Sequence, residues 1–233
     1  MTTETKNAVP TDDCNRPAGA GPVQRSVSGP VPQRAGVSVL FARGDSHYKA
    51  MELDVWDEAR DARRWPGGGP VVAHPPCRAW GRLRTFSRPA PHEKDLARWA
   101  VAQVRRWGGV LEHPAGSMLW DDQALPRPGQ QDEHGGWTLP VSQKWWGHKA
   151  EKATWLYVCG ATWRDMPPLP LTLGEATHVV QSRKRGPARP HITKAEREHT
   201  PPELARWLVE LAGRCKPANV ELTGKTGTPG LSG

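Results

Sequence analysis

The sequence lacks any long apolar run. No stretch of its 233 residues approaches the roughly 18 apolar residues of a membrane span, and the first residues, M-T-T-E-T-K-N, have no apolar segment of the kind found in a signal peptide. We therefore expect no membrane contact and a location in the cytoplasm.

Cysteine is scarce as well. The four cysteines, Cys14, Cys77, Cys159 and Cys215, are scattered and form no C-x-x-C pair, so the spacing favours neither a disulfide framework nor a zinc knuckle. The histidines near the motifs described below lack the helical i, i+4 spacing of metal ligands. We predict no metal.

Phenylalanine and tyrosine are rare, with two of each, whereas tryptophan occurs 12 times and glycine and proline 24 times each. The Gly and Pro content indicates a loop-rich protein. Tryptophan combines a large apolar area with an N–H group, and two interpretations stay open: the rings line a groove, or they fill the core.

Positive charge exceeds negative charge, since 32 Lys and Arg stand against 24 Asp and Glu, a formal net charge of +8. This surplus favours a polyanionic partner, and DNA in particular. The basic stretch 183–197 would follow phosphates by attraction that does not depend on sequence, although such a run can also be ordinary solvated surface.

The pattern along the chain predicts one α/β domain at 36–216 between a disordered N-terminal arm at 1–35 and a flexible tail at 217–233. Short β-rich runs alternate with helical patterns, which is typical of a layered, mostly parallel, Rossmann-like sheet. Strands are expected at 37–41, 70–73, 109–111 and 154–158, and helices at 93–107 and after Thr200, which would form a capping box with Glu203.

Two polar motifs follow neighbouring predicted strands, and parallel strands of one sheet end at the same edge. Cys77 lies in H-P-P-C-R after the strand at 70–73, and Glu112 in L-E-H-P after the strand at 109–111. Arg78 would favour the thiolate of Cys77, and Glu112 would supply an acid or a hydrogen-bond partner from a loop. The alternative is a structural cysteine beside a proline pair that ends a strand.

These motifs resemble those of the cytosine-C5 DNA methyltransferases, in which P-P-C carries the nucleophile and E-N-V or E-N-P carries a glutamate that contacts the base. The resemblance covers about 70–160 and implies a reduced methyltransferase-type fold. It also implies that the protein occurs in a bacterial or phage-infected bacterial cell. It implies that Cys77 attacks C6 of a pyrimidine and that Glu112 holds its N3 edge. The base would first leave the duplex stack.

The resemblance also implies S-adenosylmethionine as cofactor. In place of the family's F-x-G-x-G turn this chain has F-A-R-G-D at 41–45. By resemblance, Phe41, Gly44 and Asp45 would contact the cofactor and Asp54 would bind its ribose. The polar cluster after Phe41 could serve another ligand, or be a solvated turn.

A third segment resembles the family's P-Q-x-R-x-R pattern, with Gln143 and Lys149 before a strand. A literal Q-x-R-x-R begins at Gln181, so the assignment could be reversed. The residues expected to contact DNA are Arg78, Arg82, Gln143, Lys149, Arg183 and Arg185. Trp80 would offer a face for stacking a base.

The sequence therefore predicts an enzyme that modifies pyrimidines in DNA, with Cys77 as nucleophile. One alternative is an inactive DNA-binding or anti-restriction module on the same fold. Another is an enzyme of nucleotide or nucleobase hypermodification. The oligomeric state and the recognition sequence stay open.

Overall fold

A computed structural model describes residues 36–82, 84–172, 174–180 and 189–217. The expected N-terminal arm, nearly all of the expected tail, and Arg183 and Arg185 lie outside the described residues. Within these ranges no helix has the length and apolar character needed to cross a bilayer.

The described chain is an α/β structure built on one six-stranded sheet in the order β2-β1-β3-β4-β6-β5. The strands are β1 Ser38–Ala42, β2 Asp54–Asp57, β3 Val71–Ala73, β4 Gly109–Pro114, β5 Trp137–Ser142 and β6 Ala153–Cys159. The helices are α1 Glu93–Trp107, α2 Leu119–Asp122, α3 Lys194–Glu198 and α4 Pro202–Arg214. Short 3₁₀ helices are η1 His47–Met51, η2 Ala62–Arg64, η3 Arg84–Phe86, η4 Gln143–Trp146 and η5 Trp163–Asp165.

The sheet is mostly but not wholly parallel. Strands β2, β1, β3 and β4 pair in parallel, whereas β6 runs antiparallel between β4 and β5. Two of the six strands, β2 and β5, were absent from the sequence prediction. The chain leaves β1 toward β2 on one side and returns to β3 on the other, which makes a switch point between β1 and β3.

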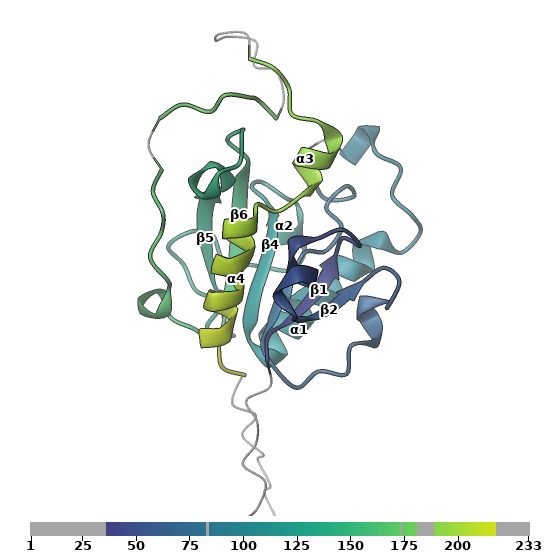
Figure 1. The fold of residues 1–233 in the computed structure, drawn as a ribbon. Coiled ribbons are helices and arrows are strands. Elements are labelled where there is room, and N and C mark those ends of the chain that lie inside the picture. Colours follow the sequence, from purple (N-terminus) through teal and green to yellow (C-terminus); the bar gives the residue numbers. More distant parts are fainter. Residues whose placement is uncertain (1–35, 83, 173, 181–188, 218–233) are drawn as a thin grey trace, which may run out of the picture. The chain divides into compact units, whose positions relative to one another are not determined.

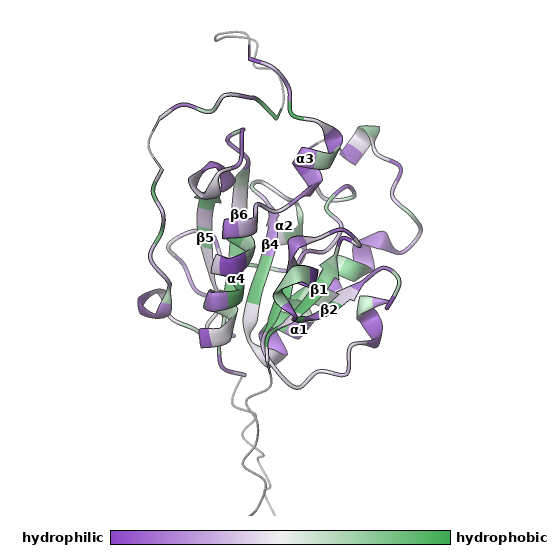
Figure 2. Ribbon diagram, viewed as in Figure 1, coloured by the Kyte–Doolittle hydropathy of each residue, from purple (hydrophilic) through white to green (hydrophobic). Residues whose placement is uncertain are grey.

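Apolar side chains cover both faces of the sheet. On one face α4 buries Leu204, Leu208 and Leu211 against Val72 and Val110. On the other, α1 buries apolar residues against Val71 and Leu111. Figure 1 shows α4 across the near face and α1 behind it, and in Figure 2 the colour of β4 changes from hydrophobic to hydrophilic toward its C-terminal end.

The first helix has the predicted bounds, because its apolar stripe is unbroken from Glu93 to Trp107 and Gly108 and Gly109 follow. Gly109 has φ +131°, and a Cβ there would collide with the Val71 carbonyl, so glycine lets β4 begin directly against β3.

Two boundary predictions were wrong. Helix α4 begins at Pro202 and its first turn closes on the Pro201 carbonyl, so Thr200 lies outside the helix and the expected capping box is not formed. Strand β4 continues to Pro114 because β6 pairs with it along its whole length, so Glu112 lies within a strand and not on a loop.

Candidate functional site

A cavity of about 1320 Å³ opens at the edge of the sheet where β1, β3 and β4 end. Its walls come from the segments that follow β1 and β3, from the end of β4, from the start of β6 and from α3. This is the edge, beside the switch point, at which open α/β sheets place ligands. Cys77 and Glu112 both line it.

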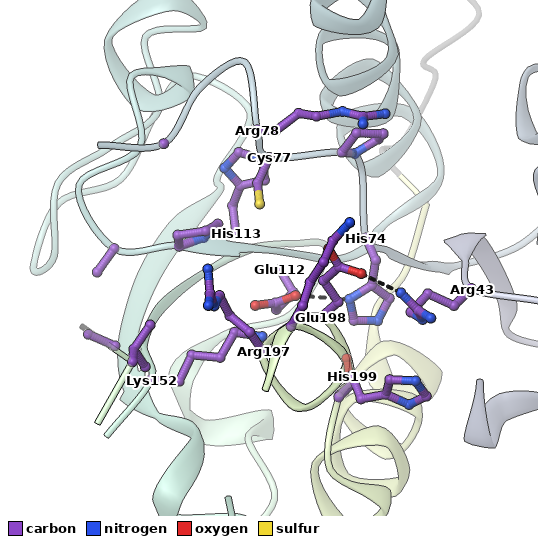
Figure 3. Close-up of a pocket in the computed structure, with 18 of the residues that line it drawn as sticks. Arg43, His74, Cys77, Arg78, Glu112, His113, Lys152, Arg197, Glu198 and His199 are labelled. Atoms are coloured by element: carbon purple, nitrogen blue, oxygen red, sulfur yellow. Dashed lines mark hydrogen bonds and ion pairs between the residues drawn. The ribbon is translucent and has the colours of Figure 1, made fainter. Parts of the chain in front are cut away.

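Cys77 lies in a tight turn just after β3. Two prolines precede it, and its carbonyl accepts hydrogen bonds from the backbone N–H groups of Trp80, at 3.0 Å, and Gly81, at 2.9 Å. The residue is exposed, and its sulfur points into the cavity toward Glu112 (Figure 3). The thiol is therefore not sealed in apolar packing.

The electrostatics at Cys77 differ from the sequence prediction. Desolvation by the cavity walls and the negative charge of Glu112 raise the pKa of the thiol, and the charge of Lys152 opposes them only in part. Arg78 does not favour the thiolate, because its guanidinium turns away and pairs with Glu93 on α1 at 2.6 Å.

Glu112 is buried and held on both carboxylate oxygens. His74 Nδ1 lies 3.0 Å from Oε2, and Gln143 Nε2 donates to Oε1 at 3.0 Å. Burial opposes its ionisation, but the charge of Lys152 and the bond from His74 outweigh burial and lower the pKa of Glu112 to about 2. The site therefore presents a fixed carboxylate, which accepts hydrogen bonds and has no proton to donate.

His74 connects this carboxylate to a buried tyrosine. The Tyr48 hydroxyl lies 2.8 Å from His74 Nε2, and burial raises the pKa of Tyr48 well above its usual value, so the phenol keeps its proton. The ionised Glu112 can only accept, so Nδ1 carries a proton and donates to it, and in the neutral ring Nε2 accepts from the Tyr48 hydroxyl. Sequence reasoning missed this positioning role, although His74 stands in the same H-P-P-C motif as Cys77.

Gln143 is the clearest correction among the expected DNA contacts. Its side chain is completely buried, and Nε2 donates to both Glu112 and Thr154. A buried amide cannot reach a phosphate. Gln143 instead positions Glu112.

His113 is part of the cavity wall and is completely buried, with Nδ1 2.8 Å from the Ser117 hydroxyl. Burial lowers the pKa of His113 to about 4, against the opposing effect of Glu112. The ring is neutral at neutral pH. The His113 ring therefore fills part of the cavity wall and adds no charge to it.

The other expected DNA contacts lie at the mouth of the cavity. Arg82 is exposed and lines it. Lys149 does not line it and is paired with Glu196 of α3 at 2.5 Å. Figure 3 shows two further cations, Lys152 and Arg197, on the side of the cavity opposite Cys77. Arg197 ends the basic stretch 183–197 that was expected to follow phosphates.

The stacking role expected of Trp80 was wrong. The ring is buried, with 2% of its surface exposed, and Lys94 and Arg98 lie over it. A base cannot reach its face.

Helix α3 is tied over the mouth by ion pairs to the loop after β1. Arg43 contacts Glu198 at 2.6 Å, and His199, just after α3, contacts Asp45 at 3.1 Å. The guanidinium of Arg43 lowers the pKa of Asp45 to about 2. The polar cluster after β1 is therefore engaged with α3.

The residues expected to bind S-adenosylmethionine do not form a cradle for it. Of the four, Phe41 alone lines the cavity. Gly44 and Asp45 lie outside its walls, and Asp54 begins β2 at the opposite edge of the sheet, where it pairs with Arg60. Asp57, at the correct end of β2, is paired with Lys49. The residues present do not fit this cofactor.

Comparison with known proteins identified no relative of this chain. No protein-family model matches it, and no curated protein and no solved structure matches it significantly.

Proposed function

We propose that this chain is an enzyme that acts on pyrimidine bases in DNA through a covalent adduct at Cys77, on a reduced, Rossmann-like fold related to the cytosine-C5 methyltransferases. One observation carries the proposal: an accessible thiol and a fixed, ionised carboxylate face each other in a single cavity. A planar ring between them would meet a nucleophile and an orienting group at once.

The chemical step needs only Cys77 and water. The thiolate of Cys77 attacks C6 of the ring, a bond forms between sulfur and C6, and the C5–C6 π pair moves to C5. A solvent proton then bonds to C5. In the reverse direction C5 loses either hydrogen, the π bond re-forms and the thiolate leaves, so the ring exchanges its C5 hydrogen with solvent.

Glu112 fixes the ring during this step. An ionised carboxylate accepts hydrogen bonds, and the pyrimidine edge offers the 4-amino group of cytosine or the N3–H of uracil as donors. His74 and Gln143 hold the two oxygens in place before any base arrives, so no ordering is needed at the moment of reaction.

The net positive charge and the cations at the cavity mouth support DNA as the substrate. A base inside a duplex cannot enter the cavity, so the target base would be turned out of the stack. No step proposed for this chain passes through a methyl donor.

Deuterium uptake tests the proposal without knowledge of a donor or a recognition sequence. Mixed-sequence DNA is incubated with the protein in D₂O, digested to nucleosides and analysed by mass. We expect deuterium at C5 of pyrimidines with the intact chain, none with Cys77→Ser, and normal uptake with Cys159→Ser, whose sulfur is buried outside the cavity. Uptake should rise with pH through neutrality, because the thiolate is the minor form there.

A second candidate is a DNA-binding or anti-restriction module with no chemistry. The raised pKa of Cys77 and the missing cofactor cradle favour it. In that case the protein would bind DNA with strong salt dependence and cause no deuterium uptake. Uptake into free nucleotides but not into DNA would instead favour an enzyme of nucleotide modification.

A further inference from the structure

Helix α3, which lies over the mouth of the cavity, carries two carboxylates that are both bound to cations of the body below. Glu196 contacts Lys149, in the turn before β6, at 2.5 Å. Glu198 contacts Arg43, in the loop after β1, at 2.6 Å, and Figure 3 shows this pair beside the cavity. The helix therefore covers, with negative charge, two cations that would otherwise be open to an anionic ligand.

The attachment of α3 to the body is mostly polar. Neither apolar cluster of the core includes a described residue of α3 or of its flanks, although Ile192, just before the helix, is buried. The helix is held also by His148, whose Nε2 lies 3.2 Å from the Glu196 carbonyl, and by the pair of His199 with Asp45. Exposed ion pairs are weak and are screened by salt, so α3 can leave the edge of the sheet while the core stays intact.

The two covered cations have the properties of phosphate contacts. Each keeps much of its side chain in solvent, 57% for Lys149 and 40% for Arg43. Carboxylate and phosphate oxygens form the same charge-assisted hydrogen bonds with ammonium and guanidinium groups. Arg43 keeps Asp45 as a second partner, whereas Glu196 is the carboxylate that pairs with Lys149 in the described part of the chain. The helix thus occupies positions that the phosphates of a nucleic-acid strand could take.

We propose that α3 is an autoinhibitory element, whose carboxylates hold Lys149 and Arg43 in the free protein and are displaced by the phosphates of a DNA strand. The choice of DNA as the displacing anion rests on the proposed function. The exchange replaces ion pairs with ion pairs, and a DNA strand supplies many phosphates where α3 supplies two carboxylates. Displacement lifts α3 from the mouth, so that a base can approach Cys77.

The first test removes the charge that covers Lys149. Glu196→Gln should leave α3 folded, because glutamine also completes a capping box with Thr193. The affinity for mixed-sequence single-stranded DNA, measured at one fixed salt concentration, should rise by about three- to fivefold, the most that one exposed ion pair usually contributes. Deuterium uptake at C5, measured with DNA well below saturation, should rise by the same factor.

Two controls separate this effect from a general change of net charge. Glu203→Gln removes an equal charge from α4, where Glu203 pairs with Arg206 outside the cavity lining, and should change DNA affinity less than about twofold. In a Lys149→Gln background, Glu196→Gln should give no gain, because no cation remains to be freed. Amide hydrogen exchange reports the displacement itself: saturating DNA should speed exchange at 194–199 in the intact chain, since so short a helix is marginal without its contacts.

Three results would overturn the autoinhibitory role of α3: an equal gain with Glu203→Gln, an undiminished gain in the Lys149→Gln background, or slower exchange at 194–199 when DNA is bound. Deuterium uptake by the intact chain without any gain in Glu196→Gln would also reject this role and leave the proposed chemistry in place. The predicted gain in affinity without uptake in any variant would instead reject the chemistry and support the role of α3.

Discussion

The two halves of the cavity edge are built in opposite ways. At the ends of β3 and β4, Glu112 is buried and held by His74 and Gln143. At the ends of β1 and β2, the charged residues form ion pairs with one another. Arg43 pairs with Asp45, and 40% of the Arg43 side chain and 59% of the Asp45 side chain are exposed.

This difference indicates which half is organised for a ligand. A buried carboxylate is costly to maintain, and its donors fix it in one geometry before a ligand arrives. Exposed ion pairs contribute about 0–1 kcal/mol each and hold a loop in place without shaping a pocket. The half that carries Cys77 and Glu112 is preorganised, and the half that the resemblance assigned to a cofactor is not.

The largest expected effect is the loss of activity when Glu112, in the preorganised half of the cavity edge, is substituted. Glu112→Gln keeps the size of the side chain and removes its charge, so it should lower deuterium uptake at C5 by about 1,000-fold, within the range usual for a positioned acid–base or orienting group. Asp45→Asn, the matched change in the other half, should alter uptake less than about threefold. Equal losses in the two variants would break the comparison.

Acid sensitivity should come from the same half. Burial lowers the pKa of His113 from 6.5 to about 4, so below pH 6.5 the unfolded chain binds a proton that the folded chain does not. Stability should therefore fall between pH 6.5 and 4 by on the order of 3 kcal/mol.

Denaturant unfolding across this range would measure that loss. His113→Asn should flatten this slope, and Asp45→Asn should leave it unchanged, because the Asp45 carboxyl has a pKa of about 2, below this range. The Glu112 carboxylate, with a pKa of about 2 against an ordinary 4.5, should contribute only at lower pH. An unchanged slope in His113→Asn would show that this ring is not held neutral.

Much of the framework follows from the sequence because it depends on local patterns. The stripe of α1 and the glycines after it fix both ends of that helix. The short strands β1 and β3 read as apolar runs, and they place H-P-P-C at the correct edge of the sheet.

The parts that escaped prediction depend on contacts distant in sequence. Strand β5 is specified by its pairing with β6. Strand β6 also pairs with β4 and extends it to Pro114, so that Glu112 lies inside β4. In the sequence Gln143 is a polar residue three positions after a proline. Nothing nearby in the sequence indicates that its amide donates a hydrogen bond to Glu112, 31 positions earlier. The sequence could name the nucleophile and the carboxylate but not the residues that position them.

The smallest expected effect concerns the ion pairs at α3. Arg43→Gln removes contacts to Asp45 and Glu198, which are exposed, so it should lower stability by no more than about 1 kcal/mol, and less at high salt. Thermal unfolding at low and high ionic strength would measure this. A loss of several kcal/mol, independent of salt, would mean that this half is as rigid as the other.

The most direct measurement asks whether Cys77 bonds to a ring that Glu112 helps to hold. Duplex DNA with random flanking sequence and one 5-azacytosine base, which keeps the 4-amino group of cytosine and is open to thiol addition at C6, would be incubated with the protein. Digestion and peptide mass analysis would then locate the adduct. We predict a nucleoside mass on the peptide that contains Cys77, much reduced in Glu112→Gln. No adduct, or an adduct on another cysteine at equal yield, would contradict the account.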